Sequence, residues 1–218
     1  MNPPETEPAA DPGIAPWITP TTIRTAHGRW IDLANVLPSD IDIYDIAHSL
    51  SRIGRFNGHT RWPWIYSVAQ HSCQVARRLP DDLALEGLLH DAAEAYIGDI
   101  TRPLKKLLEA LAPGVLKSIE SDIERAVALQ FGLTYPWPEQ LHQVDRHVCH
   151  LEEVNAWLSG ATHPFTGLTV LKADLHPSDV IDPLMAENAE ASFLARFQDL
   201  TSTRRLAAMR SKRKAAAG

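Results

Sequence analysis

The sequence Leu-Leu-His-Asp-Ala-Ala-Glu at residues 88–94 places an imidazole and a carboxylate side by side in a segment that is otherwise rich in Leu and Ala. Burying either group costs free energy unless it is hydrogen-bonded or coordinates a cation. His90 and Asp91 therefore need one of these two partners, and hydrogen bonding alone would be sufficient. On a helix Glu94 would share a side with both, because it lies four residues after His90 and three after Asp91.

Two further residues on predicted helices can join this pair. His71 lies on the apolar stripe of a helix predicted from about Ser67 to Leu79, and Asp145 lies on the stripe of a helix predicted over about 139–158. If these helices pack together, they create a site with two histidines and two aspartates. Each residue alone has an ordinary explanation, because core histidines are most often hydrogen-bonded and helical aspartates are usually solvated. Their combination favours a metal site.

A mixed nitrogen and oxygen ligand set suits a divalent ion such as Mn, Co, Mg, Zn or Fe and leaves positions open for water and a substrate oxygen. Such an ion lowers the pKa of water and polarises a phosphoryl oxygen, while Glu94 is placed to take or steer a proton. A phosphoryl group also needs cations. The candidates are Arg55 and Lys105, with Arg61 and Arg102 as weaker ones.

The 218 residues are enough for one globular domain, which we expect to span 21–200. Residues 1–20 are Pro-rich and read as a flexible leader. Residues 201–218 carry six basic and no acidic side chains and read as a flexible basic tail. The acidic remainder argues against a broad nucleic-acid surface, so we expect contact with nucleic acid at most through this tail.

We expect a cytoplasmic protein, since the sequence has no apolar run long enough to span a membrane and no signal-peptide pattern at its start. Cys73 and Cys149 have no motif spacing, so reduced thiols are expected.

Hydrophobic periodicity predicts an irregular all-α bundle of six or seven helices. A small N-terminal hairpin, with strands near 22–26 and 29–33, is expected as an appendage. The predicted helices begin at residue 42 and then cover about 67–79, 83–97, 103–111, 113–131, 139–158 and 183–200.

Four segments, in this order, carry a family resemblance. They are Arg55-Phe56, residues 66–72 (YSVAQHS), residues 90–105 (HDAAEAYIGDITRPLK) and Val144-Asp145. Together they resemble the HD-domain phosphohydrolases, and among these the bacterial 5′-deoxynucleotidases and related phage and bacterial nucleotide hydrolases. The resemblance covers about residues 45–158. The Trp62-Pro63-Trp64 segment and residues 159–182 have no obvious counterpart in it.

The resemblance implies a role for each of these residues. Four would ligate a divalent metal: His71, His90, Asp91 and Asp145. Glu94 would activate or position the attacking water, and Asp99 and Arg55 would contact the nucleotide at the reacting centre. Lys105 would serve the phosphate, and Phe56 either stacks on the base or is a core residue. Relatives of this kind imply a homodimer.

These observations predict a metal-dependent nucleotide phosphohydrolase that converts 2′-deoxynucleoside 5′-monophosphates to deoxynucleoside and phosphate. One alternative is a deoxynucleoside triphosphate triphosphohydrolase, which needs room and cations for two further phosphates. An alternative of another class is a non-catalytic helical module that binds a nucleotide or a protein.

Overall fold

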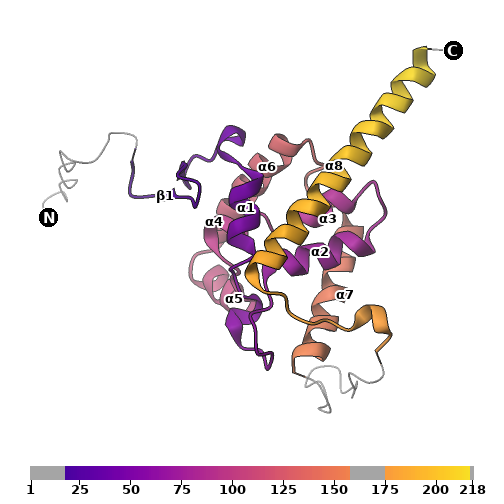
Figure 1. The fold of residues 1–218 in the computed structure, drawn as a ribbon. Coiled ribbons are helices and arrows are strands. Elements are labelled where there is room, and N and C mark those ends of the chain that lie inside the picture. Colours follow the sequence, from indigo (N-terminus) through magenta and orange to yellow (C-terminus); the bar gives the residue numbers. More distant parts are fainter. Residues whose placement is uncertain (1–17, 158–174, 217–218) are drawn as a thin grey trace, which may run out of the picture.

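The computed structural model describes residues 18–157 and 175–216, with side chains up to residue 207. The described residues form an α-helical bundle with one small antiparallel hairpin, which confirms the predicted all-α class (Figure 1). The helices are α1 (Ile43–Leu50), α2 (Val68–Arg78), α3 (Ala84–Leu89), α4 (Glu94–Ile97), α5 (Arg102–Leu111), α6 (Val115–Phe131), α7 (Glu139–Ala156) and α8 (Ala186–Ala216). The strands are β1 (Thr22–Arg24) and β2 (Trp30–Asp32). None of the described helices is both long and apolar enough to cross a membrane.

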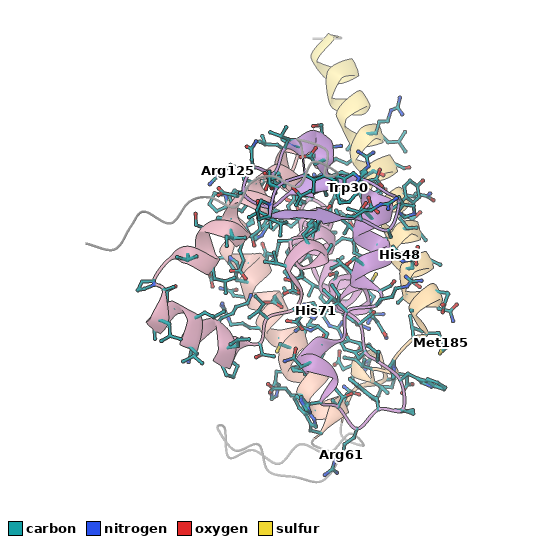
Figure 2. The ribbon with its side chains drawn as sticks, turned by 90° about the vertical axis from the view of Figure 1, so that its left-hand side faces the viewer. Trp30, His48, Arg61, His71, Arg125 and Met185 are labelled. Carbon is teal, nitrogen blue, oxygen red and sulfur yellow. The ribbon has the colours of Figure 1, made fainter. Side chains whose placement is uncertain are left out.

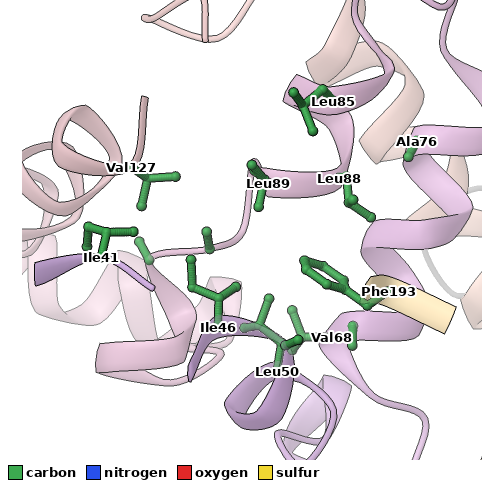
Figure 3. Close-up of a cluster of buried hydrophobic side chains, with 14 of the residues drawn as sticks. Ile41, Ile46, Leu50, Val68, Ala76, Leu85, Leu88, Leu89, Val127 and Phe193 are labelled. Atoms are coloured by element: carbon green, nitrogen blue, oxygen red, sulfur yellow. The ribbon is translucent and has the colours of Figure 1, made fainter. Parts of the chain in front are cut away.

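Helix α2 lies at the centre of the packing and contacts α3, α7 and α8. Figure 1 shows α8 crossing in front of the bundle and projecting beyond it at its C-terminal end. The main core lies under α8, where Phe193 is completely buried among Leu50, Val68 and Leu88 (Figure 3). Burial of a phenylalanine is worth about 1.5–3 kcal/mol, so this contact holds α8 against the rest of the bundle.

The predicted starts of the first two helices are confirmed by their caps. The Asp42 carboxylate accepts a hydrogen bond from the Tyr44 backbone N–H (2.8 Å) at the start of α1. The Ser67 hydroxyl accepts one from the Gln70 N–H (3.2 Å) at the start of α2. Each cap satisfies a backbone donor that has no partner within its helix.

The prediction of one continuous helix over 83–97 is wrong. Helix α3 ends at Leu89, residues 90–93 form turns, and α4 begins at Glu94. Bonds of the i to i+3 type replace the helical ones here, as from the Ala92 N–H to the Leu89 carbonyl (3.0 Å). The His90 ring also contacts the Gly87 carbonyl (2.9 Å). The predicted helix therefore breaks where its two most polar residues lie.

The hairpin forms as predicted, with Ile23 paired to Ile31, but it is not an appendage. Ile31 is completely buried in the main core, and Ile23 packs against it. The hairpin turn is also fixed to α1, because the His27 backbone N–H and its ring nitrogen Nδ1 both contact Asp45 Oδ1 (2.9 and 2.8 Å).

The last helix is longer than predicted. It begins at Ala186 and continues past Leu200 to Ala216, so most of the segment expected as a flexible basic tail is the end of α8. Strong helix formers such as Ala, Arg and Lys fill this stretch. Arg204 also donates to Glu86 Oε2 (2.6 Å) and thereby ties α8 to α3. Residues 1–17 of the predicted leader and most of the segment 159–182 lie outside the described residues.

Candidate metal centre

Three separate parts of the chain bring the predicted ligands together. His71 comes from α2, His90 and Asp91 from the break between α3 and α4, and Asp145 from α7. Asp145 Oδ1 lies 3.1 Å from His71 Nε2 and 3.7 Å from His90 Nε2. Asp91 meets both rings as well, with Oδ2 3.4 Å from His71 Nε2 and Oδ1 3.2 Å from His90 Nε2. Figure 2 shows His71 well inside the bundle.

These side chains fit a metal ion. One ligand atom each from His71, His90 and Asp145 lies within 4.8 Å of the other two, so this group could hold a cation. Both Nε2 atoms are buried, and although carboxylate oxygens of Asp91 and Asp145 lie 3.1–3.4 Å away, neither Nε2 makes a well-aligned hydrogen bond. A buried polar atom without a partner is costly, and a cation bound between the rings and the carboxylates would satisfy both nitrogens at once.

The other nitrogen of each ring fixes its orientation. His90 Nδ1 donates to the backbone carbonyl of Gly87 (2.9 Å), since a carbonyl oxygen can only accept. His71 Nδ1 contacts the Glu152 carboxylate at 2.6 Å. Burial lowers the pKa of both rings, but nearby carboxylates outweigh it and raise the pKa of His71 to about 10 and that of His90 above its usual value, so the metal-free rings carry a proton. A bound cation would displace the Nε2 proton, and Nε2 would then face the centre as in metal-binding histidines.

Glu152 is a site residue that the sequence interpretation missed. It is completely buried, and besides His71 its carboxylate accepts hydrogen bonds from the Tyr66 hydroxyl (2.8 Å) and from Arg55 Nη2 (3.2 Å). Burial raises its pKa, but His71 and Arg55 outweigh burial and keep the pKa below its usual value. Its spacing was the available signal: Glu152 lies seven residues, or two helical turns, after Asp145 and therefore on the same face of α7.

Arg55 enters the site from the turn between α1 and α2. Its guanidinium Nη1 lies 3.7 Å from Asp99 Oδ2 and 4.0 Å from Asp91 Oδ2, and only 11% of the side chain is exposed. Burial lowers the pKa of Arg55, but Glu152, Asp91 and Asp99 outweigh burial and raise it well above the ordinary value. The site therefore contains a permanently charged cation.

Glu94 and Asp99 are carboxylates on the same side of the site. Glu94 is almost completely buried and its Oε2 has no partner. Burial and the charges of Asp91 and Asp99 raise the pKa of Glu94 to about 10, and burial also raises the pKa of Asp99. Asp145 behaves differently, since the imidazoles of His71 and His90 hold its pKa far below the usual range despite burial. The carboxylates outnumber the cations here, which favours binding of a divalent cation.

Two other candidates have partners away from the ligands. Lys105 on α5 pairs with Glu120 Oε1 (2.8 Å), and 39% of its side chain is exposed. The half-buried Phe56 ring packs edge-to-face with Trp157 (centroids 4.7 Å apart) and lies 5.4 Å from the Arg55 guanidinium. Phe56 has a left-handed backbone (φ 56°), an uncommon conformation for this residue type that recurs at functional sites.

The weaker cation candidates are exposed. Arg102 begins α5 with an exposed side chain, and Arg61 is exposed in the loop before α2. Figure 2 shows Arg61 at the edge of the molecule, far from His71.

A cavity of about 590 Å³ adjoins this centre. Asp99 is in its wall, and so are Gly54 and Asn57, which flank Arg55 and Phe56 in the chain. The apolar lining is Ile53, Ile65, Ile97, Ile100 and Leu104. Gly98 turns the chain into the cavity wall with a left-handed backbone (φ 81°). A mostly apolar cavity with a carboxylate at its edge, beside a polar centre, is typical of a site for a small organic molecule.

Comparison with known proteins identifies relatives of this chain. No protein-family model matches it. The Escherichia coli K12 protein YfdR, described as uncharacterized, is 33% identical over 196 residues, which make up 85% of this chain and 98% of YfdR. A Rhodobacter capsulatus protein, also described as uncharacterized, is 40% identical over 117 residues, or 50% of this chain and 58% of the relative. The extent of the first match shows that this chain belongs to the family of YfdR.

Proposed function

We propose that this protein is a metal-dependent phosphohydrolase of the HD-domain type that acts on nucleotides. One observation carries the proposal. Two buried imidazoles are oriented by their Nδ1 contacts so that their unpartnered Nε2 atoms face two carboxylates. A purely structural pair of histidines would be expected to use both nitrogens of each buried ring in hydrogen bonds.

His71, His90 and Asp145 would hold the ion, with Asp91 as the fourth ligand. A bound divalent ion supplies Lewis acidity, which polarises a phosphoryl oxygen and acidifies water. Glu94 lies one turn beyond His90. Its pKa of about 10 keeps it protonated when no metal is bound, and the charge of a divalent ion would lower that pKa so that the buried Oε2 could take a proton from the attacking water. In-line attack by this water would form a new phosphorus–oxygen bond and break the bond to the 5′ oxygen, which would leave as the nucleoside hydroxyl after taking the proton held by Glu94.

Arg55 would neutralise the phosphate and the charge that develops on it. Its guanidinium is held rigid by Glu152 and lies between Asp91 and Asp99. A pre-oriented guanidinium can donate two parallel hydrogen bonds to a phosphoryl group without reorganising during the reaction. Asp99, at the edge of the 590 Å³ cavity, would accept a hydrogen bond from the sugar.

The charges near the centre favour a monophosphate substrate. Among the described residues, Arg55 is the buried cation beside the ligands, whereas the Lys105 ammonium pairs with Glu120. A triphosphate carries further negative charge that would need further cations. The cavity is large enough for a base and a deoxyribose, since small-molecule sites occupy about 300–1,000 Å³. We therefore favour 2′-deoxynucleoside 5′-monophosphates, and we expect a homodimer as in the family that the sequence resembles.

One assay tests this proposal. Purified full-length protein is supplied with Mn, Co or Mg and with deoxy- and ribonucleotides that carry one to three phosphates, and the released species is identified. We expect inorganic phosphate from deoxynucleoside monophosphates and no release by Asp91→Ala. Intact triphosphate would favour the triphosphohydrolase. The enzyme proposal fails if no metal supports hydrolysis and Asp91→Ala retains the metal content of the wild type.

A further inference from the structure

The structure contains a second cavity, of about 280 Å³. It is enclosed by the hairpin, by α1 and by α4, through residues that include Arg24, Asp45, Arg52, Ala95 and Tyr96. Figure 2 shows His48, which also lines this cavity, and Trp30 of the hairpin away from His71. None of the residues proposed to bind the metal lines this cavity.

Two buried polar groups in its wall lack partners. Asp45 is 3% exposed, and while its Oδ1 contacts His27, its Oδ2 has no hydrogen-bond partner. Tyr96 is 9% exposed, and its hydroxyl, near the Asp42 backbone and the Asp45 carboxylate, makes no well-aligned hydrogen bond. Unsatisfied buried polar groups are rare in folded proteins and each is costly, so their presence at one cavity points to a ligand that supplies hydrogen-bond donors.

Two arginines supply positive charge to the same cavity. The exposed Arg24 has its guanidinium over the Trp30 ring, 5.5 Å from the centroid. Arg52 binds Glu190 Oε2 through Nη1 (2.7 Å), and its hydrogen bonds to the His48 carbonyl and the Ser51 hydroxyl also use Nη1. The far side of the Arg52 guanidinium therefore remains available for an anionic group.

We propose that this cavity is a second binding site, for a small molecule with an anionic group at one end and an N–H donor at the other. The anion would bind Arg24 and Arg52, and the donor would bind Asp45 Oδ2 with support from the Tyr96 hydroxyl. A nucleoside 5′-monophosphate with an exocyclic amino group has this chemistry and is the ligand class to which we commit. The cavity volume of about 280 Å³ is just below the range of about 300–1,000 Å³ typical of small-molecule sites, so a mononucleotide would leave part of its surface in solvent.

The position of the cavity gives such a ligand a route to the metal centre. Ala95 and Tyr96 of α4 line the second cavity, Ile97 of the same helix lines the 590 Å³ cavity, and Glu94 begins the helix. Ile53 lines both cavities. A ligand that shifts this four-residue helix would shift Glu94, so binding at the second site would change the rate at the first. Only this rate effect rests on the proposed function.

Calorimetric titration of the metal-free full-length protein tests the binding. The probe is adenosine 5′-monophosphate, and inorganic phosphate, adenosine and glutamate are compared with it. Ala26→Trp fills the cavity from an exposed position of its wall, and Ala110→Trp places the same side chain on an exposed position of α5. Arg24→Ala removes one cation from the anion end, and Tyr96→Phe removes one hydroxyl from the donor end. Circular dichroism verifies that each variant is folded.

We expect the wild type and the control Ala110→Trp to bind the same number of molar equivalents of adenosine 5′-monophosphate. Ala26→Trp should bind one equivalent fewer. Arg24→Ala should lower the affinity of that equivalent about tenfold, since hydrogen bonds to charged groups are worth about one such factor. Phosphate and adenosine alone should bind more weakly than the whole nucleotide. Equal stoichiometry in all variants would overturn the proposal, and tighter binding of glutamate would overturn the choice of a nucleotide. A lost equivalent in a protein that hydrolyses no nucleotide would sink the proposed function and leave the second site standing.

Discussion

Two carboxylate–imidazole pairs in this molecule have similar contacts and different surroundings. Glu152 and His71 are 2.6 Å apart and both are completely buried. Asp45 and His27 are 2.8 Å apart, but 51% of the His27 side chain is exposed. In the outer pair water can satisfy the second ring nitrogen, so the contact need only fix the hairpin to α1. In the inner pair no water reaches His71 Nε2, and that nitrogen faces Asp91 and Asp145.

The difference shows that burial, more than the pairing itself, decides what such a pair can do. A histidine oriented by a carboxylate becomes a metal ligand when its other nitrogen is shielded from water and aimed at further ligands. The following predictions test whether the inner pair serves a metal centre and whether the outer pair is independent of that centre.

Removing a ligand should have the largest effect. In Asp145→Ala the two Nε2 atoms lose a carboxylate that both approach, so we expect metal affinity and hydrolysis to fall by more than about a hundredfold. Elemental analysis of the dialysed protein and the phosphate-release assay measure both. Gln143→Ala, two residues earlier and exposed on α7, is the control. Equal metal content in the two variants would remove Asp145 from the centre.

Weakening the inner pair should have the second-largest effect on metal affinity. Glu152→Gln keeps the volume but removes the charge that orients His71 and Arg55, and we expect about a 10- to 100-fold loss of metal affinity. Glu153→Gln makes the same chemical change at the next position and should leave the affinity unaltered. Glu152→Asp should recover part of the loss if the carboxylate acts by orientation. A Glu152→Gln protein that unfolds more easily but binds metal normally would show that Glu152 is only structural.

The substitution Gly87→Ala tests the contact between the Gly87 carbonyl and His90 Nδ1. A Cβ on Gly87 would collide with the Leu79 side chain and lie 3.3 Å from Ala76 Cα, so Gly87→Ala should push α3 away from α2. We expect a loss of about 1–3 kcal/mol in the free energy of unfolding, measured by urea denaturation. Because the Gly87 carbonyl holds His90 Nδ1, metal affinity should fall with it. An unchanged free energy of unfolding would mean that the Leu79 side chain moves aside and that the close packing of α3 on α2 at Gly87 is not required.

The outer pair should affect stability and leave the metal centre unchanged. Burial raises the pKa of Asp45, but its hydrogen bonds from His27 outweigh burial and lower the pKa below its usual value. A lowered pKa in the folded state stabilises the protein above the pKa of the unfolded chain, and this contribution disappears as the pH falls through the folded value. Asp45→Asn should therefore cost about 1–2 kcal/mol at pH 7 and progressively less below about pH 4.

Urea denaturation of the wild type and Asp45→Asn at several pH values measures this difference. Metal content should be the same in both proteins at pH 7. A stability deficit that grows on acidification would contradict the direction of the pKa shift.

The elements with a clear hydrophobic period could be predicted from the sequence. The stripes on α1, α2, α6 and α7 repeat at helical spacing, and Asp42 and Ser67 are capping residues just before α1 and α2. The break at 90–93 was not predicted, because the weak helix propensities of Gly87, His90 and Asp91 are scattered among Leu, Ala and Glu residues that favour a continuous helix. Contact of the His90 ring with the Gly87 carbonyl accompanies that break.

The residue types and their order determined which side chains could form a metal site. His71, His90, Asp91 and Asp145 are polar residues in otherwise apolar helical segments, and this pattern predicts them as ligands. Only the tertiary structure decided that their atoms meet, that Glu152 and Gly87 orient the rings, and that Lys105 turns to Glu120. Helical periodicity states which side of its own helix a residue occupies, and this is a local property of the chain. Which sides face each other, and which polar atoms remain without water, depends on how α2, α3 and α7 pack together.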